Sequence, residues 1–302
     1  MKRSRSKSDK VIARAHFADR FMTVVFCAVG GFFILLLIVL AGYIIWKGFS
    51  GYYPGLASFT KKGIGNQFFN TVYLVFLSLL ISVPLGTAAG IYMAEYAKEG
   101  KFLRFLRISI ESLSSLPSIV VGLFGYLVFI QMTGMKWNLM AGAAAVSILS
   151  IPLITTTAED AIRSLPKGYK MGSMALGAGH WQTIRKVLLP TAMPRIITGI
   201  ILAAGRGFGE AAALLYTAGQ STNINWNNFD LTSPTCPFNP FRPGETLSLH
   251  IWVMRTEGSL NPNASEIAWF SSAVLVIMVL LFSLAARMIS AKIEKNAGGE
   301  KA

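Results

Sequence analysis

Long apolar stretches alternate with short polar segments along the whole chain. Each stretch has about 20 residues or more, the length at which a helix spans the hydrocarbon core of a bilayer. The pattern therefore predicts an all-α polytopic membrane protein with six transmembrane helices in one membrane domain, residues 21–290. The predicted spans are residues 21–46, 68–94, 110–133, 137–157, 191–218 and 267–288.

The positive charges predict how these spans are oriented. The chain has 302 residues, of which 53% are hydrophobic and 14% charged, and a net charge of +14. Lys and Arg concentrate in an N-terminal tail (1–20), between the second and third spans, in and beside a loop at 158–190, and after the last span, where a tail (291–302) follows. The opposite side holds Lys47, Lys61, Lys62, Lys136, Arg242 and Arg255. Cytoplasmic segments carry the positive excess, so we expect both termini in the cytoplasm and no nucleic-acid partner.

The fifth predicted span carries two charges near its middle, Arg206 and Glu210. An arginine at the bilayer centre costs about 2.5–3.5 kcal/mol on insertion scales, and such residues usually mark the path of an ion or a substrate. In a continuous helix residues four apart share one face. Gly205, Gly207 and Gly209 would leave that face open to a neighbour or a ligand. The alternative is a structural bridge, between the two side chains or to a partner helix.

The third predicted span begins with polar residues. Its first turns contain Ser114, Ser115 and Ser118, which we expect to face the interior of the bundle and to line the same path. The alternative is close helix packing through small residues. Pro84 and Pro152 predict kinks in the second and fourth spans, where neighbouring helices satisfy the freed backbone groups.

The cytoplasmic loop 158–190 is too long for a simple turn. Pro166 predicts the start of a short helix and Gly177 its end. A second short helix is expected over 181–189, ending before Pro190. The first helix presents an apolar face made of Tyr169, Met171, Met174, Ala175 and Ala178. Such a face suits either a partner that takes up the helices or the membrane surface.

The outer loop 219–266 is the largest segment on the other side. Prolines keep its middle irregular, and residues 245–257 predict a short amphipathic helix. The loop suits a partner or a lid over the bundle, and a plain connection fits its composition equally well.

No motif for bond-breaking chemistry is present in the sequence. It contains no phosphate-binding loop, nucleophile elbow or zinc signature. Cys27 and Cys236 lie in separate segments, and His16, His180 and His250 have no metal-ligand spacing. We therefore expect a chain that is not an enzyme and binds no metal or cofactor itself.

The loop 158–190 resembles the coupling motif of ABC importer permeases. That motif reads Glu-Ala-Ala, three residues, Gly, nine residues, Ile, one residue, Leu-Pro. Here the glycine and the Leu-Pro pair have the matching spacing, a Val stands for the Ile, and Met-Gly-Ser replaces Glu-Ala-Ala. The resemblance implies that the ATPase is contacted by Met171, Gly172, Ser173, Ala175, Gly177, Val187, Leu189 and Pro190. A glutamate contact at position 171 is missing.

Further stretches are similar to phosphate-specific permeases of the PstA type. They begin at Leu116-Pro117-Ser118, at Ala175-Leu176-Gly177, at Gly205-Arg206 and at Glu245-Thr246-Leu247, and the likeness covers roughly residues 66–290. It implies the ABC type I importer permease fold in a bacterial cytoplasmic membrane. It also implies a second homologous permease, two ATPase subunits that carry ATP and Mg, and an extracytoplasmic phosphate-binding protein.

Phosphate chemistry fits this resemblance. A guanidinium presents a planar fork that suits tetrahedral oxyanions, and Glu210, one turn on, would partly neutralise Arg206 when phosphate is absent. Two alternatives remain open from the sequence: a permease for molybdate or sulfate, and a self-contained ion channel or secondary transporter. The loop 158–190 favours the ATP-driven class, because a secondary transporter needs no element for docking an ATPase.

Overall fold

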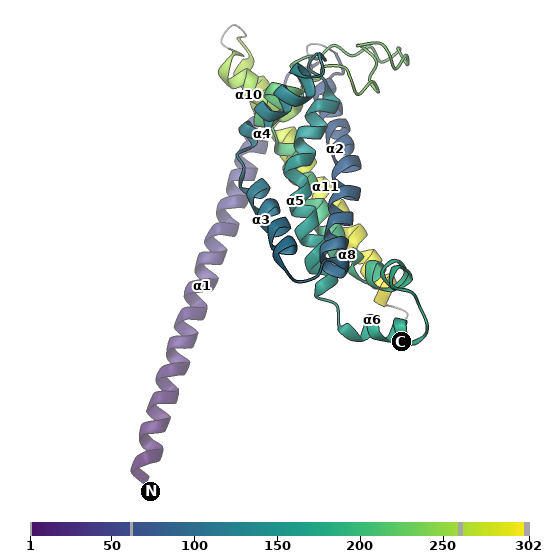
Figure 1. Ribbon diagram of the computed structural model, residues 1–302. Coiled ribbons are helices and arrows are strands. Elements are labelled where there is room, and N and C mark those ends of the chain that lie inside the picture. The colour runs from purple at the N-terminus through teal and green to yellow at the C-terminus, as the bar shows by residue number, and fades with distance from the viewer. Residues whose placement is uncertain (1, 61–62, 259–261, 299–302) are drawn as a thin grey trace.

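The computed structural model describes residues 2–60, 63–258 and 262–298, which form helices joined by loops (Figure 1). The helices are α1 (Lys2–Ser50), α2 (Gly65–Ile91), α3 (Lys101–Ser115), α4 (Ser118–Gly125), α5 (Leu139–Arg163), α6 (Lys167–Ala175), α7 (His180–Thr183), α8 (Leu189–Gly209), α9 (Ala212–Thr217), α10 (Leu247–Thr256) and α11 (Ala264–Gly298). The π-helical turns Tyr92–Tyr96, Tyr126–Gln131 and Ile184–Leu188 extend α2, α4 and α7. Lys61 and Lys62, which the sequence assigns to the outer side, lie outside the described residues.

Five helices in the described part of the chain are long and apolar enough to cross a membrane, and a bent pair gives a sixth span. The five are Ala15–Ser50, Gly65–Tyr96, Leu139–Arg163, His180–Gly209 and Ala264–Lys292, and the bent pair is Lys101–Ser115 with Ser118–Gln131. The all-α polytopic class expected from the sequence is thereby confirmed. Each span includes most of one predicted apolar stretch.

The third predicted span, 110–133, is not one helix. The chain bends by 98° between α3 and Ser118–Gln131. Leu116 is extended, with ψ of 132°, because the residue before a proline is pushed out of the helical region, and Pro117 has no N–H to continue the ladder. The apolar pattern runs through this break and conceals it.

Two further helix ends differ from the prediction. The second short helix does not stop before Pro190, since His180–Gly209 forms one span. The π-helical turn Ile184–Leu188 rearranges the hydrogen bonds directly before this proline, so the missing N–H does not end the helix. The fifth predicted span, 191–218, breaks at Glu210, which has ψ of 121°, and α9 starts two residues later.

Close helix packing forms the centre of the bundle, where α5 packs against both α2 and α8. Glycines allow the approach: a Cβ on Gly90 of α2 would lie 2.6 Å from Ala158 Cβ of α5, and one on Gly199 of α8 would lie 2.6 Å from Thr157 Cγ2. The Ser147 hydroxyl donates to the Ser78 carbonyl across the same contact, at 3.0 Å. These helices therefore form one tightly packed unit.

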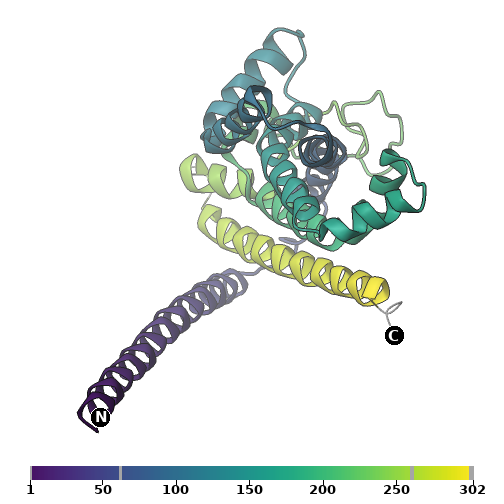
Figure 2. The same cartoon turned by 60° about the horizontal axis from the view of Figure 1, so that its bottom comes forward.

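Helix α1 stands apart from this unit along most of its length, as Figure 2 shows. None of the residues in its most apolar window is buried. Its last turns pack on α11, where Tyr43 and Trp269 have ring centroids 5.8 Å apart and Phe49 and Phe270 5.6 Å apart. The helix begins at Lys2, so the predicted tail 1–20 continues the first span as helix from residue 2. The exposed apolar surface suits lipid or a second membrane subunit.

Candidate functional site

The segment around α6 and α7, residues 164–190, lies at the end of the molecule opposite α10 (Figure 1), and we call it the coupling element. We call the α6 end of the molecule the inner end and the α10 end the outer end. Helix α6 has no buried residue. At its end Gly177 adopts a φ of +85°, a conformation that favours glycine, and this turns the chain towards α7. The predicted end of the first short helix at Gly177 is therefore confirmed.

Apolar side chains of the coupling element point into solvent. Leu176 is 91% exposed, and Met171, Met174 and Trp181 are also exposed. A hollow of about 450 Å³ lies between α6 and α7. It is lined by Tyr169, Ser173, Leu176, Gly177, Ala178, Gln182 and Val187. Exposed apolar groups around a hollow are typical of a surface that receives a partner.

The residues predicted to contact the ATPase differ in how exposed they are and in what they contact. Ser173 faces α7, where its Oγ lies 3.0 Å from Thr183 Oγ1. Leu189 is half-buried against the inner core, and Pro190 is exposed. On the open surface lie Met171, Gly172, Ala175 and Gly177. The glycine and the exposed apolar groups shape the surface, while Leu189 fixes the element to α5 and α8.

Arg206 and Glu210 do not share a helix face, because the helix ends between them. Arg206 is exposed on α8, whereas Glu210 is buried. The Glu210 carboxylate accepts a hydrogen bond from the Ala213 N–H at 3.1 Å, and its carbonyl accepts one from the Ser248 hydroxyl at 2.6 Å. Within the described residues there is no ion pair between the two charges. The prediction that they share one helix face is wrong, and neutralisation of Arg206 by Glu210 stays a prediction.

The glycines beside Arg206 differ in their surroundings. A Cβ on Gly207 would meet Val75 at 3.3 Å, so this glycine faces the bundle. A Cβ on Gly205 or on Gly209 would meet nothing within 4 Å. Arg206 thus lies on a face of α8 that the described part of this chain leaves uncovered.

The predicted path serines lie at the break between α3 and α4. Ser114 and Ser115 end α3 and are exposed, and Ser118 begins α4 and is half-buried. Helix α4 packs on α9: a Cβ on Gly122 would lie 2.7 Å from Ala213 Cα. The structure thus packs the two short helices that follow the breaks against each other. Among the described residues no hydrogen bond joins these serines to Arg206.

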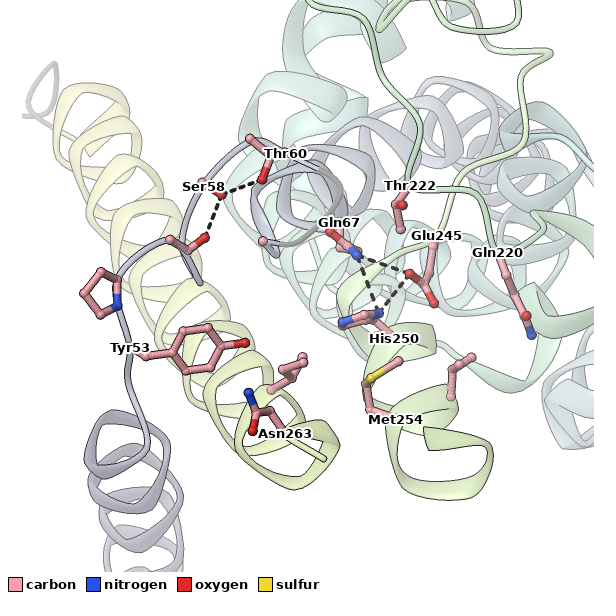
Figure 3. Close-up of a pocket in the computed structure, with 15 residues that line it drawn as sticks. Tyr53, Ser58, Thr60, Gln67, Gln220, Thr222, Glu245, His250, Met254 and Asn263 are labelled. Atoms are coloured by element: carbon pink, nitrogen blue, oxygen red, sulfur yellow. Dashed lines mark hydrogen bonds and ion pairs between the residues drawn. The ribbon is translucent and has the colours of Figure 1, made fainter. Parts of the chain in front are cut away.

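A polar cavity at the outer end was not predicted. Its volume is about 720 Å³, and it lies between the loop after α1, the start of α2, and helices α10 and α11 (Figure 3). The His250 Nδ1 lies 2.8 Å from the Glu245 carboxylate, and the Gln67 amide donates to the same carboxylate at 3.2 Å. Because an ionised carboxylate only accepts hydrogen bonds, Nδ1 of His250 is the donor in this contact. Gln67 lies 178 residues before Glu245 in the chain, and this separation hid the cluster from sequence reasoning.

Arg242 holds the outer loop onto α2. Its side chain is fully buried and donates to Asn70 Oδ1 at 2.6 Å and to the Pro237 carbonyl at 3.1 Å. Burial lowers the pKa of Arg242 to about 10, so the guanidinium remains charged at neutral pH. The predicted amphipathic helix of this loop is present as α10, capped by the Thr246 side chain.

Two ionic networks at the inner end were also missed. Glu159 of α5 binds Arg107 of α3 at 2.7 Å and Arg163 at 2.8 Å. Glu95 binds Lys170 and His180 of the coupling element. The acids stand at the ends of apolar stretches, and apart from Arg163, four residues from Glu159, their partners are 52 to 85 residues away in the sequence. In the described residues no group of three His, Cys, Asp or Glu side chains could hold a metal ion.

The fold, the long apolar spans and the exposed inner element together define a multi-span membrane permease. Residues 86–297 match the family described as binding-protein-dependent transport system inner membrane component. The probable ABC transporter permease protein YqgI of Bacillus subtilis is 50% identical over 235 residues, covering 78% of this chain and 80% of that protein. The phosphate transport system permease protein PstA of Xylella fastidiosa is 34% identical over 254 residues, covering 82% and 83%.

The chain therefore belongs to the binding-protein-dependent transport system inner membrane component family. A solved bacterial ABC transporter involved in the import of the acidic polysaccharide alginate is similar in fold, with a TM-score of 0.60, 16% identity, and coverage of 89% of this chain and 96% of that chain. The ABC type I importer permease fold is thus confirmed. The chain is a transport subunit and not an enzyme; it works with an ATPase on a separate subunit and with a substrate-binding protein.

Proposed function

We propose that this chain is the permease subunit of an ATP-driven phosphate importer and forms half of the translocation path. The similarity to PstA of Xylella fastidiosa supports phosphate as the substrate. A second, homologous permease supplies the other half, and the two uncovered glycines beside Arg206 allow its helix to approach.

One observation supports an oxyanion as the substrate: Arg206 is exposed in the last turn of α8, near the end of the apolar span His180–Gly209, and has no acidic partner among the described residues. Phosphate at neutral pH carries one to two negative charges, and its burial requires a compensating positive charge. A guanidinium provides that charge together with two parallel hydrogen bonds. The hydroxyls of Ser114, Ser115 and Ser118 are additional donors along the same path.

The coupling element is the proposed docking site for the ATPases. Two such subunits, which carry ATP and Mg, would contact one coupling element on each permease. The exposed apolar groups and the hollow between α6 and α7 support this role. The missing glutamate at Met171 makes the contact more apolar than the motif implies. The residues of this contact are those predicted from the motif.

The orientation in the membrane is part of the same proposal. Helix α6, the start of α1 and the end of α11 lie at one end of the molecule, and α10 lies at the other (Figure 1). We assign the α6 end to the cytoplasm, because it carries most of the basic loops. The outer loop 219–266 then faces a phosphate-binding protein, and the chain spans the cytoplasmic membrane of a bacterium.

Two alternatives to a phosphate importer are a permease for another oxyanion and a self-contained channel or secondary transporter. Molybdate and sulfate are also tetrahedral oxyanions, and Arg206 would hold them by the same hydrogen bonds. A self-contained channel or secondary transporter is disfavoured, because the chain belongs to a family of binding-protein-dependent transport components.

Replacement of Arg206 tests the path directly. Arg206→Gln in the assembled complex should abolish phosphate uptake while the complex still assembles. Arg287→Gln is the matched control, since it removes the same charge from an exposed position on α11 and should leave uptake intact. Normal uptake by Arg206→Gln would refute the path, and a loss of assembled complex would instead assign Arg206 to the seam between subunits.

A further inference from the structure

Glu95 stands at the inner end of α2, in the π-helical turn Tyr92–Tyr96. One oxygen of its carboxylate, Oε2, lies 2.6 Å from Lys170 Nζ and 3.1 Å from His180 Nε2. Lys170 belongs to α6 and His180 starts α7, so one carboxylate oxygen binds both helices of the coupling element. The ring of Tyr96 packs on His180, with centroids 4.9 Å apart.

These contacts join α6 directly to α2. No residue of α6 is fully buried, and its side chains Met171 and Met174 are exposed. The side chain of Glu95 is only 10% exposed and that of Lys170 is 38% exposed, so this ion pair is partly shielded from solvent. A π-helical turn is also a common feature of functional positions in helices.

The opposite end of α2 holds the outer loop. The amide of Asn66 donates to the Thr222 carbonyl at 2.8 Å, and that of Asn70 donates to the Glu245 carbonyl at 2.9 Å. The oxygen of Asn70 receives the bond from Arg242. Between its ends α2 lies in close contact with α5 at Gly86 and Gly90. Helix α2 therefore connects the coupling element to the outer loop through one packed unit.

We propose that Glu95 is a positioning residue that fixes the coupling element to α2 and so transmits movement between the ATPase side and the outer loop. The inference rests on the proposed docking role of the coupling element. Without the Glu95 contacts, α6 can follow the ATPase without moving α2. ATP hydrolysis then continues, but it no longer responds to the loaded binding protein.

The test uses the complete complex in proteoliposomes with its binding protein and phosphate. Glu95→Gln should keep the ATPase bound and lower the stimulation of ATP hydrolysis by at least about fivefold, the lower end of typical coupling between sites. Lys170→Gln should act in the same direction. Glu99→Gln is the matched control, because this exposed glutamate follows four residues later, outside the contact. Unchanged stimulation in both Glu95→Gln and Lys170→Gln would overturn the proposal.

Charge reversal separates positioning from simple stability. Glu95→Lys and Lys170→Glu should each lose stimulation, and the double variant should regain most of it, because the ion pair is restored with reversed signs. A double variant no better than the singles would also overturn the proposal. Failure of the docking role itself has a different signature: the ATPase would stay bound when the exposed Leu176 is replaced by Asp.

Discussion

Arg206 and Glu210 are four residues apart, yet a helix break separates them, and Glu210 caps α9 through the Ala213 N–H at 3.1 Å. The carboxylate is therefore engaged in holding the local backbone, and within the described residues it forms no ion pair with the arginine. This arrangement leaves Arg206 as an uncovered cation on α8. The helix break therefore changes the expected role of Glu210: the residue is a structural support beside the proposed substrate site and not a partner within it.

Glu210→Ala should therefore lower stability. Loss of a helix cap costs about 1 kcal/mol, and the buried Ala213 N–H also loses its acceptor. Glu210→Gln keeps the Oε1 acceptor and should be much closer to the wild type. Thermal unfolding of the purified complex in detergent measures the difference. If Glu210→Gln leaves the unfolding midpoint unchanged but abolishes phosphate uptake, Glu210 acts on the substrate, contrary to this account.

Leu176→Asp should reduce the amount of ATPase that purifies with the permease by about tenfold, because an anchor side chain at the centre of an interface is often worth more than 1 kcal/mol. The fold should tolerate the change, since Leu176 is 91% exposed. Leu231→Asp is the control: this leucine, in the outer loop, is 62% exposed. Equal ATPase recovery for the two variants would contradict docking at the coupling element.

Gly177→Ala should distort the turn of the coupling element. A φ of +85° costs a residue with a Cβ about 1–2 kcal/mol, although there is open space around the position. Gly179→Ala is the matched control. A Cβ on Gly179 would also meet no atom within 4 Å, but Gly179 has a φ of −68°, which any residue can adopt. ATPase affinity, measured by titration of the permease pair, should fall for Gly177→Ala alone. The same loss for both would indicate that the turn conformation is irrelevant.

Arg242→Met should loosen the outer loop. The change leaves Asn70 Oδ1 and the Pro237 carbonyl without their donor, at a cost of about 1–3 kcal/mol per buried group. Arg255→Met should cost less, because Arg255 is exposed and contacts the Trp269 ring at 4.7 Å, a contact worth about 0.5–1 kcal/mol. Limited proteolysis within 219–245 reports the loosening. Equal protection of the two variants would show that Arg242 does not hold the loop.

The sequence predicts the spans well, because their signal is local: about 20 apolar residues in a row. It also predicts the turn at Gly177, where a glycine follows a helical pattern. The break at Glu210 has no proline beside it, and its cause is the capping of Ala213 and the contact with Ser248, which lies on a distant segment. Such a break requires tertiary structure to be seen.

The ionic contacts of Glu95 show the same limit. Lys170 and His180 lie 75 and 85 residues further along the chain, so no local pattern joins them. The charges themselves were visible in the sequence as part of the basic inner loops. Only the packing of α2 along α5 shows that they meet. Arg206, in contrast, is visible in the sequence as an unusual charge, because a single arginine in an apolar stretch is conspicuous by itself. The sequence places it near the middle of a span, whereas the structure places it in the last turn of α8.

Substrate-dependent ATP hydrolysis by the reconstituted complex tests the central claim most directly. The permease pair, the ATPases and the loaded binding protein would be assayed in proteoliposomes with phosphate, sulfate or molybdate in turn. The account predicts that phosphate stimulates hydrolysis and is taken up, that the other two anions do neither, and that Arg206→Gln removes the response. Stimulation and uptake with sulfate or molybdate but not with phosphate would contradict it.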